Sequence, residues 1–253
     1  MKVIAIQSGS KGNCIYLETG NTQLLFDAGI SGLRAQNCLA HFGIDIRRVD
    51  ALFVTHEHCD HVSHAGTFNR KFKIPLWMTE KTHEASKKRI GRVANVQHFQ
   101  ANTSFRFQNV TIEAISTPHD AVDSVCFVVD DGHFRFGVCT DLGHVFPDLP
   151  GVIESLDGVL LESNYDPEML EMGIYPPELK ARVRGLHGHL SNIEASTLVQ
   201  RHGKRLQQVM LGHISDENNT EPLVLQTLQR IAGNRCPCEL AHRHACSNQL
   251  EFV

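Results

Sequence analysis

Four side chains of the metal-binding types lie within six residues, in the string HEHCDH at positions 56–61. They are His56, His58, Asp60 and His61. The string directly follows the apolar run Ala51–Thr55, which predicts a strand. Imidazole and carboxylate groups suit zinc, iron or manganese. Four such groups cannot all point into a core, because buried polar groups need partners. A loop that leaves the strand can turn them towards one point. We therefore predict a metal centre here and not a solvated histidine-rich loop.

Three more candidate ligands follow apolar runs further along the chain: His119, Asp141 and His213. Each run predicts a strand, so each candidate stands where the carboxyl end of a strand meets a loop. Sites in α/β sheets are generally found at that position. Sixteen histidines among 253 residues also point to metal binding, since histidine is the commonest metal ligand among side chains.

The elements that must position these residues are mostly strands in the first half of the chain and alternating strands and helices in the second. No repeat, linker or low-complexity stretch interrupts them, which predicts one α/β domain with sheets packed on each other and helices outside. The predicted helices are Ser31–Phe42, Pro177–Arg184, Asn192–His202 and Glu221–Ile231. The predicted strands are Val3–Ile6, Cys14–Leu17, Gln23–Asp27, Ala51–Thr55, Pro75–Met78, Ser104–Phe107, Val110–Ser116, Ser124–Asp130, Phe134–Thr140, Gly158–Glu162, Gln208–Leu211, Cys238–Ala241 and Gln249–Val253.

The composition limits which partners the protein can attract and indicates the cellular compartment to expect. A net charge of -4 provides no overall field that attracts nucleic acid, so such contacts would need a local patch or the metals. No secretory signal and no apolar stretch near 18 residues is present, so we expect a cytoplasmic protein without a membrane span. The eight cysteines are scattered, and we expect free thiols in a reducing compartment.

The ligand series resembles the metallo-β-lactamase superfamily, with its HxHxDH signature and three later ligands. The resemblance implies an αββα sandwich of two mixed β-sheets packed face to face with helices outside. It also implies two divalent metal ions, which can be zinc, manganese or iron. His56, His58 and His119 would hold the first ion, Asp60, His61 and His213 the second, and Asp141 would bridge them. Asp27, in the string LFDAG, would orient the metal loop, and Asp60 would also steer a proton of the attacking water.

Four strings resemble the YycJ/WalJ group of exonuclease-like bacterial proteins more closely: SGSKGN at 8–13, LESNYD at 161–166, GHLSN at 188–192 and LGHISDENN at 211–219. This resemblance implies hydrolysis of DNA or RNA, with His189 as proton donor and with Ser191, Asn192 and Asn164 as substrate contacts. Ser191 is equally suited to cap the helix from Asn192. Asp141 and His213 are too close in sequence for a β-CASP insertion, so residues 1–253 would form one hydrolase domain.

Two other functions remain open from the sequence. A thioester or ester hydrolase of glyoxalase II type uses the same ligand set, and a non-catalytic metal-binding protein would also need it. The C-terminal Cys236, Cys238, His242, His244 and Cys246 form a second cluster, but their spacing matches no established zinc pattern. We therefore expect buried cysteines and surface histidines there.

Overall fold

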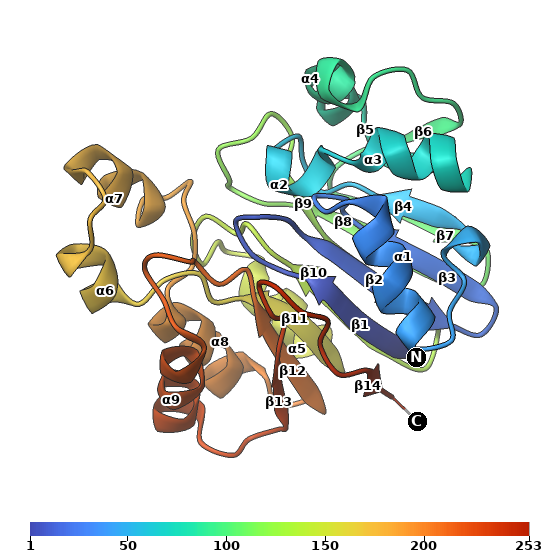
Figure 1. Ribbon diagram of the computed structural model, residues 1–253. Helices are drawn as coiled ribbons and strands as arrows, with labels where there is room; N and C mark the ends of the chain where they lie inside the picture. The colour runs from blue at the N-terminus through green and yellow to red at the C-terminus, as the bar shows by residue number, and fades with distance from the viewer. Residues whose placement is uncertain (253) are drawn as a thin grey trace.

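The computed structural model describes residues 1–252, which form two seven-stranded mixed sheets (Figure 1). The first sheet has the order β14 (Leu250–Glu251), β1 (Lys2–Gln7), β2 (Cys14–Thr19), β3 (Thr22–Phe26), β4 (Ala51–Phe53), β5 (Leu76–Thr79) and β6 (Val96–Phe99). The second has the order β13 (Cys238–Leu240), β12 (Gln208–Gly212), β11 (Gly158–Glu162), β10 (Arg135–Cys139), β9 (Val125–Asp130), β8 (Val110–Ser116) and β7 (Thr103–Phe107). Every predicted strand is present, although Val253 of the last one lies outside the described residues.

Apolar side chains from the inner faces of both sheets form the central layer of the core. Residues two apart on a strand share a face, so alternate positions point inward while the others face the helices. Phe127 shows the inward packing, because its ring lies 5.4 Å from that of Phe26 and 5.7 Å from that of Phe53. Burial of this apolar area fixes how the two sheets face each other.

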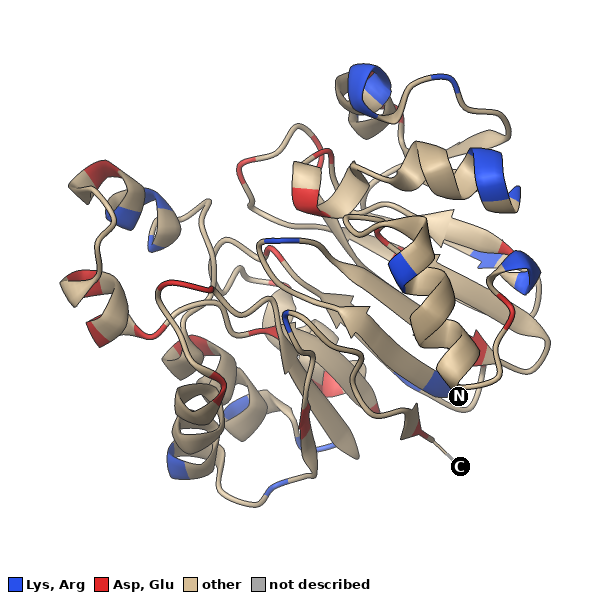
Figure 2. Ribbon diagram, viewed as in Figure 1, with Lys and Arg blue, Asp and Glu red and all other residues tan. Residues whose placement is uncertain are grey.

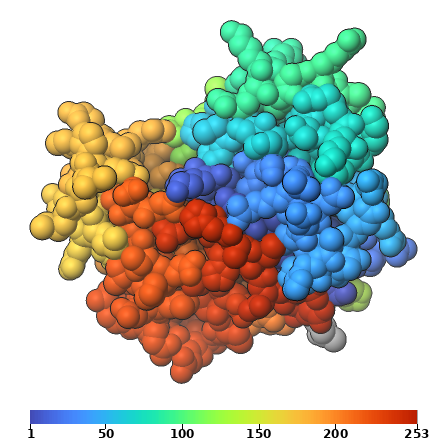
Figure 3. All heavy atoms as spheres, in the orientation of Figure 1, coloured from blue at the N-terminus to red at the C-terminus, as the bar shows by residue number. Residues whose placement is uncertain are grey.

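Helices cover both outer faces and complete the predicted αββα sandwich (Figure 1). The first sheet is covered by α1 (Gly32–His41), η1 (Ile46–Arg48), α2 (Cys59–Val62), α3 (Ala65–Thr67), η2 (Phe68–Phe72) and α4 (Glu80–Ile90). The second is covered by α5 (Leu149–Ser155), α8 (Asn192–His202) and α9 (Glu221–Ala232). The segment with α6 (Pro167–Met172) and α7 (Pro177–Val183) stands out from the side of the molecule, in yellow in Figure 3.

Several of these elements were not predicted, and α4 shows the physical reason. Its buried positions are Thr82, Ser86 and Ile90, which are four residues apart and so lie on one face of the helix. Two of the three are polar, so the apolar periodicity that marks an amphipathic helix is absent. Thr79 caps this helix by accepting a hydrogen bond from the amide of Thr82. Helices α5 and α6 and strand β6 were missed as well.

Strand direction places the candidate ligands at one edge of the sandwich. Strand β3 is parallel to β4 in the first sheet, and β10, β11 and β12 are mutually parallel in the second. Strands β8 and β10 both run antiparallel to β9, so they run in the same direction. Three residues just beyond strand ends have left-handed backbones, with φ of 61° at Asp27, 57° at Asp141 and 53° at His213. Such φ values are uncommon for residues other than glycine and cluster at functional sites.

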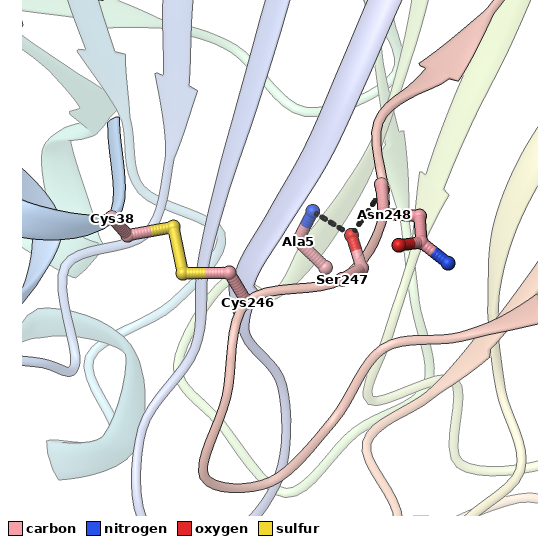
Figure 4. Close-up of a disulfide and its surroundings, with 5 residues drawn as sticks. All are labelled: Ala5, Cys38, Cys246, Ser247 and Asn248. Carbon is pink, nitrogen blue, oxygen red and sulfur yellow. Dashed lines mark hydrogen bonds between the residues drawn. A yellow bond between two sulfur atoms is a disulfide. The ribbon is translucent and has the colours of Figure 1, made fainter. Parts of the chain in front are cut away.

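The expectation that all eight cysteines are free is wrong for one pair. Cys38 on α1 forms a disulfide with Cys246, across 208 residues of chain (Figure 4). The C-terminal segment is brought against β1 by Ser247, whose hydroxyl accepts a hydrogen bond from the amide of Ala5. Cys38 and Cys246 therefore meet through tertiary packing, which the spacing of the cysteines in the sequence does not predict. The other six cysteines are unpaired.

The C-terminal cysteine and histidine cluster is dispersed in the fold. Cys246 lies in the disulfide, whereas Cys236 and Cys238 are half-buried near the edge strand β13. His242 pairs with Glu221, and His244 lies 3.7 Å from Asp216. Within residues 1–252 these side chains form no group of three that would hold a metal ion. No helix in that range has the length and apolar character needed to cross a membrane.

Candidate metal centre

The seven candidate ligands converge at the edge where the strands end. The ligand atoms of His56, His58 and His119 lie within 4.8 Å of one another, and so do those of Asp60, His61 and His213. Asp141 lies between these two groups. Its Oδ2 is 3.2 Å from Nε2 of His61, and its Oδ1 is 3.6 Å from Nε2 of His119 and 3.5 Å from Nε2 of His213. The two clusters therefore share one carboxylate.

Four imidazole rings are fixed through Nδ1, which directs Nε2 towards the centre. The Nδ1 of His56 lies 2.9 Å from the hydroxyl of Thr55, and that of His61 lies 2.7 Å from Oδ2 of Asp27. The Nδ1 of His119 lies 3.0 Å from the carbonyl oxygen of Gly188. The Nδ1 of His213 lies 3.4 Å from Oε1 of Glu162. Partners of this kind set the ring orientation and tautomer of metal-binding histidines.

Asp27 connects the first sheet to the metal loop. It is 2 % exposed, and its Oδ1 accepts hydrogen bonds from the amide and the hydroxyl of Thr55 at 2.8 and 3.1 Å. Its other oxygen faces His61 at 2.7 Å. Through Thr55 the carboxylate also supports His56, so one side chain orients a histidine in each of the two clusters.

Buried polar atoms at the centre lack protein partners. Nε2 of His56, Nε2 of His213 and Oδ2 of Asp141 are all buried without a hydrogen bond. Buried polar groups are nearly always paired, so an atom left free in this position requires a ligand. Imidazole nitrogens and a carboxylate oxygen are the donors that zinc, manganese and iron accept. The residues present therefore fit a metal centre, and the shared carboxylate is consistent with two ions.

The electrostatics of the cluster keep His56 neutral and both carboxylates ionised, while these carboxylates outweigh burial and raise the pKa of His61 and His213. Burial and the neighbouring imidazoles lower the pKa of His56 well below its ordinary value, which keeps that ring neutral. Burial raises the pKa of Asp60, but the facing imidazoles of His61 and His213 outweigh burial and lower it. Asp141 shows the same balance, with His213 and His61 holding its pKa well below the usual range. Both carboxylates are therefore ionised and can bind cations.

Glu162, at the end of β11, was named in the sequence only as part of an acidic string, and the structure places it inside the site. It is fully buried, and its Oε1 lies 2.6 Å from Nδ1 of His189. Its Oε2 accepts hydrogen bonds from the amides of Leu142 and Leu190. Burial raises its pKa, and the imidazoles of His189 and His213 lower it to about 2. His189 is thereby held with Nδ1 3.7 Å from Oδ1 of Asp141.

Ser191 and Asn192 have structural partners within the protein, and their expected role as substrate contacts stays a prediction. Ser191 is the N-cap of α8, and it forms a capping box with Glu194. Asn192 is fully buried and bonded to Ser163 and Asn219. The structure therefore confirms the capping role of Ser191. Asn164 is engaged as well, since its Nδ2 donates to the carbonyl oxygen of His213 at 2.8 Å and lies 3.1 Å from Nδ1 of that ring.

The loop that contains Asn13 was singled out by its sequence but not assigned a role. The amide of Asn13 donates to the carbonyl oxygen of Asp60 at 2.7 Å, and its Nδ2 lies 3.0 Å from Nε2 of His61. The amide of Gly29 donates in turn to the carbonyl of Asn13. A Cβ at Gly29 would lie 1.7 Å from the carbonyl oxygen of Asp60. Only glycine therefore permits this close approach of the metal loop to the first sheet.

Comparisons with known proteins agree with this geometry. Residues 22–214 match the model of the Beta-lactamase superfamily domain. The chain is 37% identical over 234 residues to Exodeoxyribonuclease WalJ of Streptococcus pneumoniae, which covers 90% of this chain and 86% of the relative. It is 31% identical over 229 residues to Exodeoxyribonuclease YycJ of Bacillus anthracis, covering 89% and 87%. The fold is similar to the solved metallo-beta-lactamase fold protein YhfI of Bacillus subtilis, with a TM-score of 0.77, 15% identity and 99% of each chain covered.

Replacing Asp27 with asparagine should weaken metal binding without removing a ligand. Asparagine keeps the shape and tolerates the left-handed backbone, but it removes the carboxylate that faces His61. We expect the affinity to fall by about 10–100-fold, the range for changes to the groups that orient ligands. Chelator competition measures the affinity, with Asp148→Ala as control because Asp148 is exposed and its side chain caps no helix amide. Equal affinities in Asp27→Asn and wild type would contradict this role.

Gly29→Ala should displace the metal loop, because the added Cβ collides with the backbone of Asp60. We expect metal affinity to drop at least about tenfold, and overpacking of this kind lowers stability by about 1–3 kcal/mol. Gly151→Ala is the matched control, since a Cβ there meets nothing within 4 Å. Metal titration and thermal unfolding of the two variants give the comparison. Wild-type metal affinity in Gly29→Ala would show that the close approach is dispensable.

Proposed function

This chain belongs to the metallo-β-lactamase superfamily, and we propose that it is a dinuclear-metal phosphodiesterase that degrades DNA or RNA from an end. The observation that supports this most strongly is the shared carboxylate of Asp141 between two clusters of histidine and aspartate. We extend the proposal to the whole of residues 1–253 as one hydrolase domain without a β-CASP insertion.

The residues divide into two sets around Asp141. His56, His58 and His119 would hold one ion, and Asp60, His61 and His213 the other, with Asp141 shared. Zinc, manganese and iron all suit these nitrogen and oxygen donors. A bound pair of such ions supplies an activated water and neutralises charge on the attacked phosphate.

The chain's own groups then handle protons. Asp60 is an ionised acceptor at the edge of the cluster, 17% exposed in its side chain, and we assign it to steer a proton of the attacking water. His189 is half-buried beside the cluster, and Glu162 holds it through Nδ1. We assign its other nitrogen, Nε2, to donate a proton to the leaving oxygen. General acid catalysis of this kind contributes about 100-fold or more.

The named activity of the relatives supports nucleic acid as the substrate. Two curated relatives that match about nine-tenths of this chain are called exodeoxyribonucleases. The net charge of -4 gives no long-range attraction for a polyanion, so binding would depend on the ions and on local basic groups. Figure 2 shows basic residues on α4 and α7, on either side of the strand ends.

Removal of ligands or metals should abolish hydrolysis. We expect about two metal ions per chain in wild type, and activity at background after chelation. His56→Ala, Asp60→Ala and Asp141→Ala should each lose activity with the circular dichroism spectrum of the wild type. Metal analysis, bis-p-nitrophenyl phosphate and end-labelled single-stranded and duplex DNA are the assays.

S-lactoylglutathione separates this proposal from the thioester hydrolase. Hydrolysis of that thioester without cleavage of any phosphodiester would contradict the proposal. Full phosphodiesterase activity in metal-free protein would also contradict it.

His189→Ala should keep both metals and slow the cleavage of DNA by about 100-fold or more. A smaller loss is expected for bis-p-nitrophenyl phosphate, because p-nitrophenolate leaves without being protonated. His187→Ala is the matched control, since this nearby histidine is exposed and its side chain hydrogen-bonds to the carbonyl oxygen of Pro118 and not to the metal cluster. Equal losses on both substrates, or loss of metal, would indicate that His189 has another role.

A further inference from the structure

A small cavity of about 140 Å³ adjoins the metal centre. It shares Asn164 and His189 with the centre, and Asp120 lies on its wall 3.3 Å from Nε2 of His119. A group bound in this cavity would therefore be next to a phosphate held at the metal centre. Tyr175, Leu179, Arg182 and Val183 line the cavity and belong to the segment with α7, which projects from the body of the molecule (Figure 1).

One wall of the cavity is apolar and aromatic. Tyr175, Leu179 and Val183 line it, and all three are half-buried. Leu179 and Val183 are one helical turn apart, so they lie on the same face of α7. Helix α7 has no buried residue of its own, so this face packs into no core. An aromatic ring beside two aliphatic side chains is a surface on which a planar ring can stack.

Polar residues also line the cavity, and one of them has an unpartnered amide. Asn218 lines the cavity and is 1 % exposed, yet neither Nδ2 nor Oδ1 has a hydrogen-bond partner. Both amide atoms are buried, so the side chain must turn towards the cavity to meet a ligand. Leaving a buried amide unpaired costs about 1–3 kcal/mol, so a ligand that pairs with the turned side chain gains up to that much in binding. An amide offers both a donor and an acceptor, which matches the edge of a nucleobase. A phosphate only accepts hydrogen bonds, so it would leave Oδ1 unpaired.

The charges of the cavity also favour an uncharged ring. Its cationic residue, Arg182, donates from Nε to Oδ2 of Asp120 at 2.6 Å, so the two charges offset each other. Oδ1 of Asp120 also lies 3.8 Å from Nε2 of His58, so the Arg182–Asp120 ion pair is next to the metal centre. The remaining guanidinium donors of Arg182 are available to a phosphate at the mouth, because its side chain is 60 % exposed.

We propose that this cavity receives the terminal nucleobase of a nucleic acid strand, stacked on Tyr175 and hydrogen-bonded to Asn218, with Arg182 on the adjoining phosphate. The inference rests on the proposed phosphodiesterase function and names the part of the substrate that this end of the site recognises. A base in this cavity is out of the helical stack, so the strand end must be single-stranded or frayed.

The test compares oligodeoxynucleotides that carry a normal or an abasic residue at the end that wild type degrades. We expect wild type to prefer the normal end by about tenfold in kcat/KM, the scale of one stacked base. Tyr175→Leu should bring this ratio close to one, whereas Tyr175→Phe should keep it. Ile174→Ala is the control, because Ile174 is 85 % exposed and lies next to Tyr175 but does not line the cavity.

Asn218→Ala adds a readout that a structural role would not give. Because the amide has no partner, its removal should leave the Tm unchanged or raise it, while the preference for the normal end falls. A lower Tm with an unchanged preference would overturn the role of Asn218. Equal cleavage of normal and abasic ends by wild type would overturn the whole inference.

Binding separates failure of the cavity from failure of the proposed function. The metal-loaded protein is titrated with deoxyadenosine 5′-monophosphate and with deoxyribose 5-phosphate, neither of which needs to be hydrolysed. Tighter binding of the nucleotide in wild type and its loss in Tyr175→Leu would support the cavity even if no oligonucleotide were cleaved. Equal binding of the two compounds would overturn the cavity, even in a protein that degrades DNA.

Discussion

The structure depends on one arrangement: each buried imidazole at the strand ends has a fixed partner on the side that faces away from the centre. Removing polar rings from water is unfavourable unless they are hydrogen-bonded, and a free ring would also rotate. Asp27 and Thr55 hold His56 and His61, and Glu162 holds His213. The inner nitrogens of His56 and His213 and one oxygen of Asp141 are left without protein partners, so the chain folds into a site that is complete only with cations.

The two sheets make this arrangement possible by ending at the same edge. Three residues at this edge have left-handed backbones, each of which costs about 1–3 kcal/mol. This cost is offset by three apolar layers, one between the sheets and one under each set of helices. The rigid layers also explain why Gly29 is needed, because a packed sheet cannot move aside for the metal loop.

Chemistry and recognition reside in different parts of the chain. The ligands come from short segments at the ends of buried strands, which fix their positions. The cavity beside them is closed by α7, a helix that buries none of its own residues and whose segment projects from the body (Figure 3). Solvent-exposed segments tolerate sequence change better than strands do, since few core contacts depend on them. A shared metal centre can therefore serve different substrates when such a segment differs.

The sequence alone determined all the strands except β6, most of the long helices and the seven candidate ligands, because apolar periodicity and the spacing of His56 to His61 are local properties. It could not determine Glu162 as the partner of His189, since those residues are 27 positions apart and meet only when β11 lies beside the GHLSN segment. The capping box of Ser191 with Glu194 is local, since Glu194 follows three residues later, and the structure confirms the capping role that the sequence had left open beside substrate binding. The Cys38–Cys246 disulfide and the unpaired amide of Asn218 likewise depend on which distant segments pack together. Local pattern fixes which elements form, whereas long-range packing decides which polar groups find partners and which are left for a ligand.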